Sequence, residues 1–87
     1  MNSISTVLRD YLHIHYPASR SFDFTDHDSL LTLGVVDLFG IIDLMSYLER
    51  QYYISFDDGT FTPADYDSIT KLASAVESRL FISPVET

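Results

Sequence analysis

Histidines and carboxylates are the side chains of this chain with the chemistry to catalyse a reaction. The sequence contains His13, His15 and His27 together with 13 aspartates and glutamates. Residues two apart on a helix lie on different faces, so His13 and His15 would not act on one substrate together. No serine lies in the glycine-flanked turn that exposes the nucleophile of many hydrolases. These observations predict that the chain is not an enzyme.

Metal binding is a second chemistry that carboxylates support. Residues 23–28 and 57–59 are rich in aspartate, but neither segment has the alternating oxygen ligands and the closing glutamate of a calcium-binding EF-hand loop. The chain contains no cysteine, which excludes thiolate metal sites, disulfides and cysteine nucleophiles. Aspartates on both sides of His27 are typical of a solvated turn. We therefore predict no metal site.

The most regular pattern of the chain lies in residues 34–52, with the sequence GVVDLFGIIDLMSYLERQY. Asp37 is a predicted helix N-cap, because its side-chain oxygen can accept a hydrogen bond from a free backbone N–H one turn later. Gly40 costs about 1 kcal/mol of helix stability relative to alanine, which indicates that another group comes close to the start of this helix. Apolar residues then recur at steps of three and four and form one stripe: Ile41, Ile42, Met45, Leu48 and Tyr52.

Length and composition predict one small globular domain over residues 1–87, with a core at about 3–81 and a frayed tail at 82–87. Hydrophobic residues make up 46% of the chain, and glycine and proline occur three times each, so the composition is that of a folded protein. The N-terminal residues lack a signal-peptide layout, and no apolar run reaches membrane-spanning length. The expectation is a cytoplasmic, monomeric protein without membrane contact.

The formal net charge of −8 restricts the classes of partner. Nucleic-acid binding through phosphate neutralisation is not expected, because only five basic residues are present and they are scattered: Arg9, Arg20, Arg50, Lys71 and Arg79. Anionic membranes are disfavoured for the same reason. The charge favours steering towards basic protein surfaces, an effect that salt screens. It is equally compatible with a role in solubility alone.

Helix signals in the N-terminal half predict a first helix and a pinned connection. Ser3 caps a helix that runs to about His15, and Pro17 ends it because the residue before a proline avoids the helical region. Residues 18–33 are too long a connection to be structureless in a compact domain. The predicted buried residues of this connection are Phe22, Phe24, Leu30, Leu31 and Leu33.

The C-terminal half predicts two further helices. A turn at residues 57–59 follows the long helix, with Ile54 and Phe56 as the expected buried residues. The segment Thr62–Tyr66 predicts one short helical turn. Asp67 is the predicted cap of the last helix, which Pro84 ends and whose apolar positions are Ile69, Leu72, Val76 and Leu80. The predicted fold is all-α, a small antiparallel four-helix bundle of three main helices and one short third helix.

The pattern G-V-V-D-x-F-G-I-I-D-L-M at residues 34–45, followed by L-E-R-Q-Y, resembles the second helix of acyl, aminoacyl and peptidyl carrier proteins. The resemblance extends over nearly the whole chain, because the long first loop, the apolar Phe56 and the short turn at residues 63–66 also lie where that family has them. It implies a carrier-protein-like bundle that presents a thioester-bound acyl or aminoacyl group to partner enzymes.

The resemblance also implies a cofactor, 4'-phosphopantetheine, bound as a phosphodiester to a serine that follows the aspartate equivalent to Asp37. This chain has Leu38 at that position, and a leucine has no oxygen to esterify. The D-S-L sequence at residues 28–30 contains Ser29, but it lies in the loop upstream, where capping of a local turn explains it. The chain is therefore either an attachment-dead variant of a carrier or a relative that has lost the arm.

Partners implied by the resemblance are an acyl- or aminoacyl-activating ligase, a transferase or a synthase with a basic docking patch. In the family, acidic residues of the second helix meet that patch, and Asp43 and Glu49 keep this character here. Phe39, Ile42 and Leu38 would add apolar contact. Leu38 itself either joins an exposed apolar patch or folds back onto the loop. The alternative function is a non-catalytic docking module that uses the carrier fold for protein–protein interaction.

Overall fold

The computed structural model describes residues 3–56 and 62–82, and the side chains of residues 3–56 and 62–80. The longer helices are α1 (Ile4–His15), α3 (Leu38–Tyr52) and α4 (Ile69–Ile82), and α2 (Leu30–Leu33) is a single turn. Two 3-10 turns, η1 (Pro17–Ser21) and η2 (Pro63–Tyr66), lie in the connections. Since the described residues contain no strand, the prediction of an all-α fold is confirmed for them. The predicted turn at residues 57–59 and the predicted stop at Pro84 lie outside the described residues.

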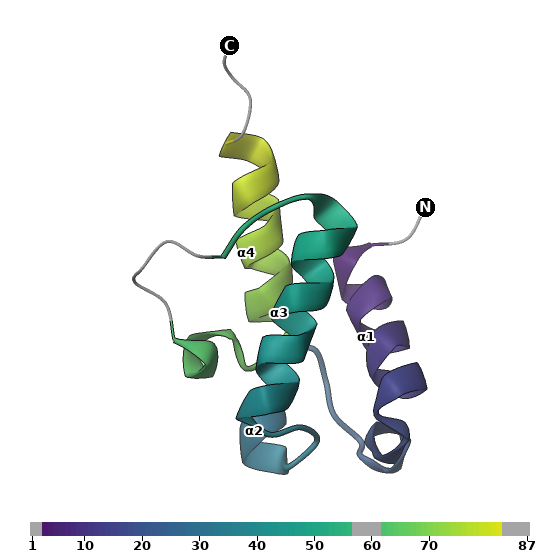
Figure 1. The fold of residues 1–87 in the computed structure, drawn as a ribbon. Helices are drawn as coiled ribbons and strands as arrows, with labels where there is room; N and C mark the ends of the chain where they lie inside the picture. Colours follow the sequence, from purple (N-terminus) through teal and green to yellow (C-terminus); the bar gives the residue numbers. More distant parts are fainter. Residues whose placement is uncertain (1–2, 57–61, 83–87) are drawn as a thin grey trace.

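The directions of the helices correct the predicted bundle (Figure 1). α1 runs opposite to α3, as expected for an antiparallel arrangement. α3 and α4 run in the same direction, because η2 and the start of α4 lie towards the end of the molecule where α3 begins. The bundle is thus antiparallel only between α1 and the other two long helices.

Side-chain caps fix where the helices begin. Ser3 accepts a hydrogen bond from the N–H of Thr6, which confirms the predicted cap of α1. The predicted cap of α4 is wrong by one residue, because Ser68 and not Asp67 accepts from the N–H of Lys71. The carboxylate of Asp67 instead accepts hydrogen bonds from the Ser29 hydroxyl at 2.6 Å and the Lys71 ammonium at 3.1 Å. The contact with Ser29 joins the loop before α2 to the start of α4, and the contact with Lys71 lies at the first turn of α4.

The hydrophobic core lies between the three long helices and extends under the long connection. Its fully buried large side chains are Leu8, Leu12, Leu30, Ile41, Leu44, Leu48, Phe56, Ile69, Leu72 and Val76. The predicted stripe of α3 was shifted, since Leu44 is buried and Ile42 is 45% exposed. Three other residues predicted to be buried are exposed, namely Phe22, Leu33 and Leu80. Each lies near an end of its element, where fewer neighbours are available to cover it.

Specific contacts pin the long connection, as its length requires. The Arg9 guanidinium lies over the ring of Phe24 and forms a 2.6 Å ion pair with Asp26. The backbone carbonyl of Asp26 accepts from the N–H of Thr70, and the N–H of Leu30 donates to the carbonyl of Asp67. α2 and the segment before it are thereby held against α1 and the start of α4. This arrangement determines where α3 starts.

Candidate docking site at the start of α3

The start of α3 presents Leu38 at an accessible position. The Asp37 side chain accepts a 2.9 Å hydrogen bond from the N–H of Gly40, so the predicted N-cap is confirmed. Leu38 is the first residue of the helix and is 49% exposed, and its neighbour Phe39 is 80% exposed. The position that would carry the arm in a carrier protein therefore lies at the surface, on the tip of a helix.

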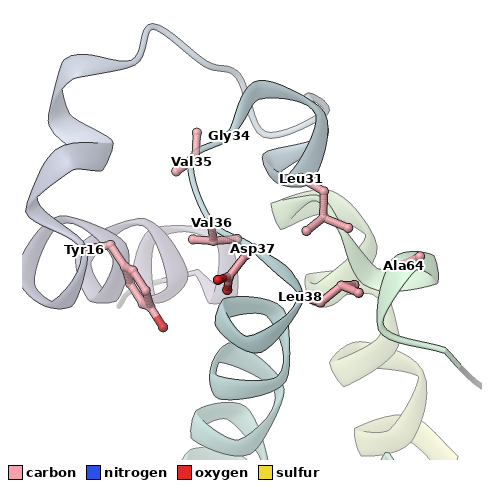
Figure 2. Close-up of a pocket in the computed structure, with 8 residues that line it drawn as sticks. All are labelled: Tyr16, Leu31, Gly34, Val35, Val36, Asp37, Leu38 and Ala64. Carbon is pink, nitrogen blue, oxygen red and sulfur yellow. The ribbon is translucent and has the colours of Figure 1, made fainter.

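A hollow of about 800 Å³ lies beside this helix tip. Its lining is mostly apolar and consists of Tyr16, Leu31, Gly34, Val35, Val36, Asp37, Leu38 and Ala64. Figure 2 shows Leu38 on the side formed by Leu31 and Ala64, and the Asp37 carboxylate on the side of Tyr16. The two expectations for Leu38 were an exposed apolar patch and a side chain folded back onto the loop. It lies between them, because it lines the hollow together with Leu31 and is still 49% exposed.

The chain enters the hollow through a tight turn at Gly34. This residue ends α2 with a φ of 81°, in the left-handed region that glycine adopts without steric cost. The N–H of Val35 then donates to the carbonyl of Leu30 at 2.9 Å, and both Val35 and Val36 are buried. The turn and the two buried valines fix the residues between α2 and Asp37. They thereby place Asp37 and Leu38 at the rim.

Gly40 is required by a close contact within the protein. A Cβ atom at this position would lie 2.6 Å from the Cβ of Val36, a separation that real Cβ atoms do not show. The sequence indicated that some group approaches the helix start closely, and the structure shows that this group is the buried Val36. The glycine thus lets the segment before the helix pack against the first turn.

We expect Gly40→Ala to destabilise the protein by about 1–3 kcal/mol, the usual cost of overpacking a core. Alanine is the better helix former by about 1 kcal/mol, but the contact with Val36 can be relieved only by moving the backbone. Urea denaturation of both proteins measures the difference. In a Val36→Ala background the Cβ–Cβ clash remains, so the penalty should persist, whereas in Val36→Gly it should disappear. A stabilising Gly40→Ala in the unaltered chain would contradict the packing argument.

Two acidic residues predicted to contact partners, Asp43 and Glu49, accept hydrogen bonds from other parts of the protein. The Oδ2 atom of Asp43 accepts hydrogen bonds from the hydroxyls of Tyr11, at 3.0 Å, and Tyr16, at 2.8 Å. Glu49 accepts a 2.8 Å hydrogen bond from the backbone N–H of Phe56. Asp43 therefore ties α3 to α1, and Glu49 ties α3 to the segment that follows it. Both are only partly exposed.

Tyr16 is a residue of the site that the sequence did not single out. It is the C-cap of α1, it lines the hollow, and its hydroxyl donates to Asp43, which is 27 residues away in the chain. Burial, the hydrogen bond to Asp43 and the negative charge of that carboxylate together raise the pKa of Tyr16 to about 12. The only sequence signal was its place before Pro17, which predicted a helix end and no tertiary contact.

The raised pKa of Tyr16 predicts a loss of stability in alkaline solution. A tyrosine whose pKa rises from 10.0 in the unfolded chain to about 12 in the folded chain favours folding fully below pH 10. This contribution is lost as the pH rises from 10 towards 12. We expect the free energy of unfolding, measured by urea denaturation across this range, to fall less steeply for Tyr16→Phe. An unchanged slope in Tyr16→Phe would show that Tyr16 ionises normally.

Ser29 serves the fold in the way that its place in the loop predicted. Its Oγ atom accepts from the N–H of Thr32 and donates to Asp67, so it caps α2 and joins it to the start of α4. The hydroxyl is therefore engaged in two hydrogen bonds.

The described residues were also compared with the requirements of metal sites and membrane spans. Within residues 3–56 and 62–82, no three metal-ligating side chains gather into a cluster that could hold an ion. His27 instead makes a 3.2 Å contact through Nδ1 with the Thr70 hydroxyl. In the same part of the chain, no helix combines the length and apolar character needed to cross a bilayer.

Comparison of the chain with known proteins finds no matching family model, no matching curated protein and no matching solved structure.

Proposed function

We propose that this chain is a carrier-type domain that docks on an acyl- or aminoacyl-handling enzyme through the start of α3. The observation that supports this most directly is the placement of Leu38. It is the first residue after the capping Asp37, it is half exposed, and it borders the hollow. A group attached there would extend away from the rigid end of a helix, which is what a carrier needs in order to present it.

The helix tip has the electrostatic features that suit a phosphodiester, but it lacks the atom that would bind one. The first backbone N–H groups of an α-helix have no acceptors within the helix, and the positive end of the helix dipole favours an anion. Leu38 provides no hydroxyl, so 4'-phosphopantetheine does not fit this chain as a covalent group. The proposal is accordingly a carrier that cannot be loaded, either as an attachment-dead variant or as a relative that has lost the arm.

The proposed partners are a ligase, a transferase or a synthase that handles acyl or aminoacyl groups. The net charge of −8 would steer the chain towards an enzyme with a basic docking patch. Asp43 and Glu49 are held by Tyr11, Tyr16 and Phe56, so their part in docking would be to add to this long-range field.

Restoring the hydroxyl tests the proposal. The Leu38→Ser protein, incubated with coenzyme A and a phosphopantetheinyl transferase, should gain the mass of one phosphopantetheine group. A correctly folded Leu38→Ser protein that stays unmodified would overturn the carrier assignment.

A non-catalytic docking module that uses the carrier fold for protein–protein interaction is the second candidate, and the exposed apolar side chains favour it. Phe39 is 80% exposed, and Leu38 and Ile42 are 49% and 45% exposed on the same end of α3. Contiguous apolar side chains at the surface of a soluble domain commonly mark an interaction site. This candidate predicts partner binding by the chain as it is and no loading of Leu38→Ser.

A further inference from the structure

One side of α3 faces away from the rest of the protein along its whole length. Phe39, Ile42, Ser46 and Arg50 follow one another at steps of three and four, so they share this side, and Tyr53 comes directly after the last residue of the helix. We call these five residues the outward face of α3. Phe39, Ile42, Arg50 and Tyr53 are exposed, and Ser46 is partly exposed. Phe39 is 80% exposed and Tyr53 is 94% exposed. The outward face therefore has a bare aromatic side chain at each end.

The charge of the outward face is opposite to that of the whole protein. Arg50 is exposed and forms no ion pair among the described residues, where the ion pairs are Arg9–Asp26 and Lys71–Asp67. The two carboxylates of α3 lie on the edges of the face and accept hydrogen bonds within the protein. Asp43 accepts from two tyrosine hydroxyls, and Glu49 accepts from a backbone N–H. The face is thus apolar and cationic on a chain with a net charge of −8.

Tyr53 supplies a second, independent observation. Its backbone has φ 56° and ψ 47°, in the left-handed region that a residue with a Cβ adopts at a steric cost. It is the only non-glycine residue with a positive φ in residues 3–56 and 62–82. A glycine would end α3 without that cost, and the tyrosine ring buries almost nothing within the fold. An aromatic side chain that the fold does not need is available for contact with a partner.

We propose that the outward face of α3 binds an amphipathic helix of a partner protein that carries a carboxylate within its apolar stripe. The apolar residues of that helix would pack on Phe39 and Ile42 at one end and on Tyr53 at the other. These ends are about 21 Å apart at 1.5 Å per residue, which matches a partner helix of about four turns. Its carboxylate would meet Arg50 at the centre.

A second copy of this chain does not fit the same face. Its outward face offers Arg50 no carboxylate, and two chains of charge −8 repel each other. The inference extends the proposed function, because it names the contact chemistry of the partner. It concerns the chain as it is and does not require Leu38 to be modified.

Two synthetic helical peptides test the inference. Both have leucine at steps of three and four on an alanine and glutamine background, and one residue in the middle of the leucine stripe is Glu in the first and Lys in the second. Binding is followed by the amide chemical shifts of the full chain. We expect the Glu peptide to bind at least about tenfold more tightly and to shift residues 39–53. A preference for the Glu peptide cannot come from the net charge, which favours the Lys peptide.

Variants of exposed residues separate the contributions. Arg50→Glu should reverse the preference between the peptides, and Phe39→Ser and Tyr53→Ser should each weaken binding of the Glu peptide by about tenfold or more. Phe22→Ser is the matched control, because Phe22 is also exposed but lies in the first connection, and it should leave binding unchanged.

Absence of binding below a Kd of about 1 mM, shifts that map away from α3, or a preference unaffected by Arg50→Glu would each overturn the inference. Its failure is distinguishable from failure of the proposed function. Loading of Leu38→Ser with no peptide binding would remove only the inference, and peptide binding with no loading would remove only the carrier assignment.

Discussion

The Leu38→Ser protein is expected to change from inert to fully loadable, gaining the mass of one 4'-phosphopantetheine group from coenzyme A. The reason is geometric. The new hydroxyl would lie on the first residue of α3, directly after the capping Asp37, at a position where the present side chain is 49% exposed. Intact-protein mass spectrometry measures the gain, and fragmentation assigns it to a residue.

The substitution should preserve the fold, so a negative result is interpretable. Burial of a whole leucine side chain stabilises a protein by about 1.5–3 kcal/mol, and Leu38 buries only about half of its side chain. The free energy of unfolding should therefore fall by about 1 kcal/mol in Leu38→Ser. Leu38→Ala is the matched control, since it removes the same apolar surface without supplying an oxygen. It retains Ser29 and should stay unmodified. Modification of Leu38→Ala would show that the arm attaches elsewhere and that α3 was assigned the wrong role.

Phe56→Ala is expected to reduce the free energy of unfolding by about 3–5 kcal/mol, the usual cost of truncating a buried phenylalanine. Phe56 is 1% exposed, and its ring lies 5.6 Å from that of Tyr66 in η2 and 4.8 Å from the Arg79 guanidinium of α4. Its loss would remove the ring contacts of the segment after α3 with both elements. A domain of 87 residues typically has a total free energy of unfolding of about 4–13 kcal/mol. The substitution would therefore remove a large part of it.

Urea denaturation of Phe56→Ala and of Phe22→Ala measures this difference with a matched control. The two substitutions remove the same atoms, but Phe22 is 36% exposed. Phe22→Ala should therefore reduce the free energy of unfolding less than Phe56→Ala does. Equal losses would mean that the core does not extend under the segment after α3 in the way the structure shows.

The internal hydrogen bonds of Asp43 and Glu49 affect how docking experiments are designed. Charge reversal of Asp43 would leave the hydroxyls of Tyr11 and Tyr16 without their acceptor, and reversal of Glu49 would do the same to the N–H of Phe56. Leaving a partly buried donor unpaired costs about 1–3 kcal/mol. A loss of partner binding in these variants would therefore combine a change of charge with a change of fold. Arg50 and Phe39 report on docking alone, because they are exposed.

Local chemistry allowed the sequence to predict the long helices and the caps of α1 and α3, whereas the cap of α4 was predicted one residue too early. Ser3 and Asp37 cap α1 and α3 as predicted, because capping depends on a hydrogen bond between residues three apart. Phe24, Leu30 and Phe56 are buried as predicted, since a large apolar side chain in a loop of a small domain has few other places to go. The position of Leu38 at a helix start also followed from such local signals.

The tertiary structure alone decided which side of α3 is outward and how its charges are used. The apolar pattern of α3 is wide enough to accommodate either Ile42 or Leu44 in the core, and the packing of α1 and α4 selected Leu44. Asp43 accepts hydrogen bonds from Tyr11 and Tyr16, which are 32 and 27 residues away in the chain. No local pattern could therefore show that its carboxylate forms hydrogen bonds within the protein. The reason is physical: a helix cap depends on neighbours in sequence, whereas the exposure of a face and the partners of a carboxylate depend on segments that folding brings together.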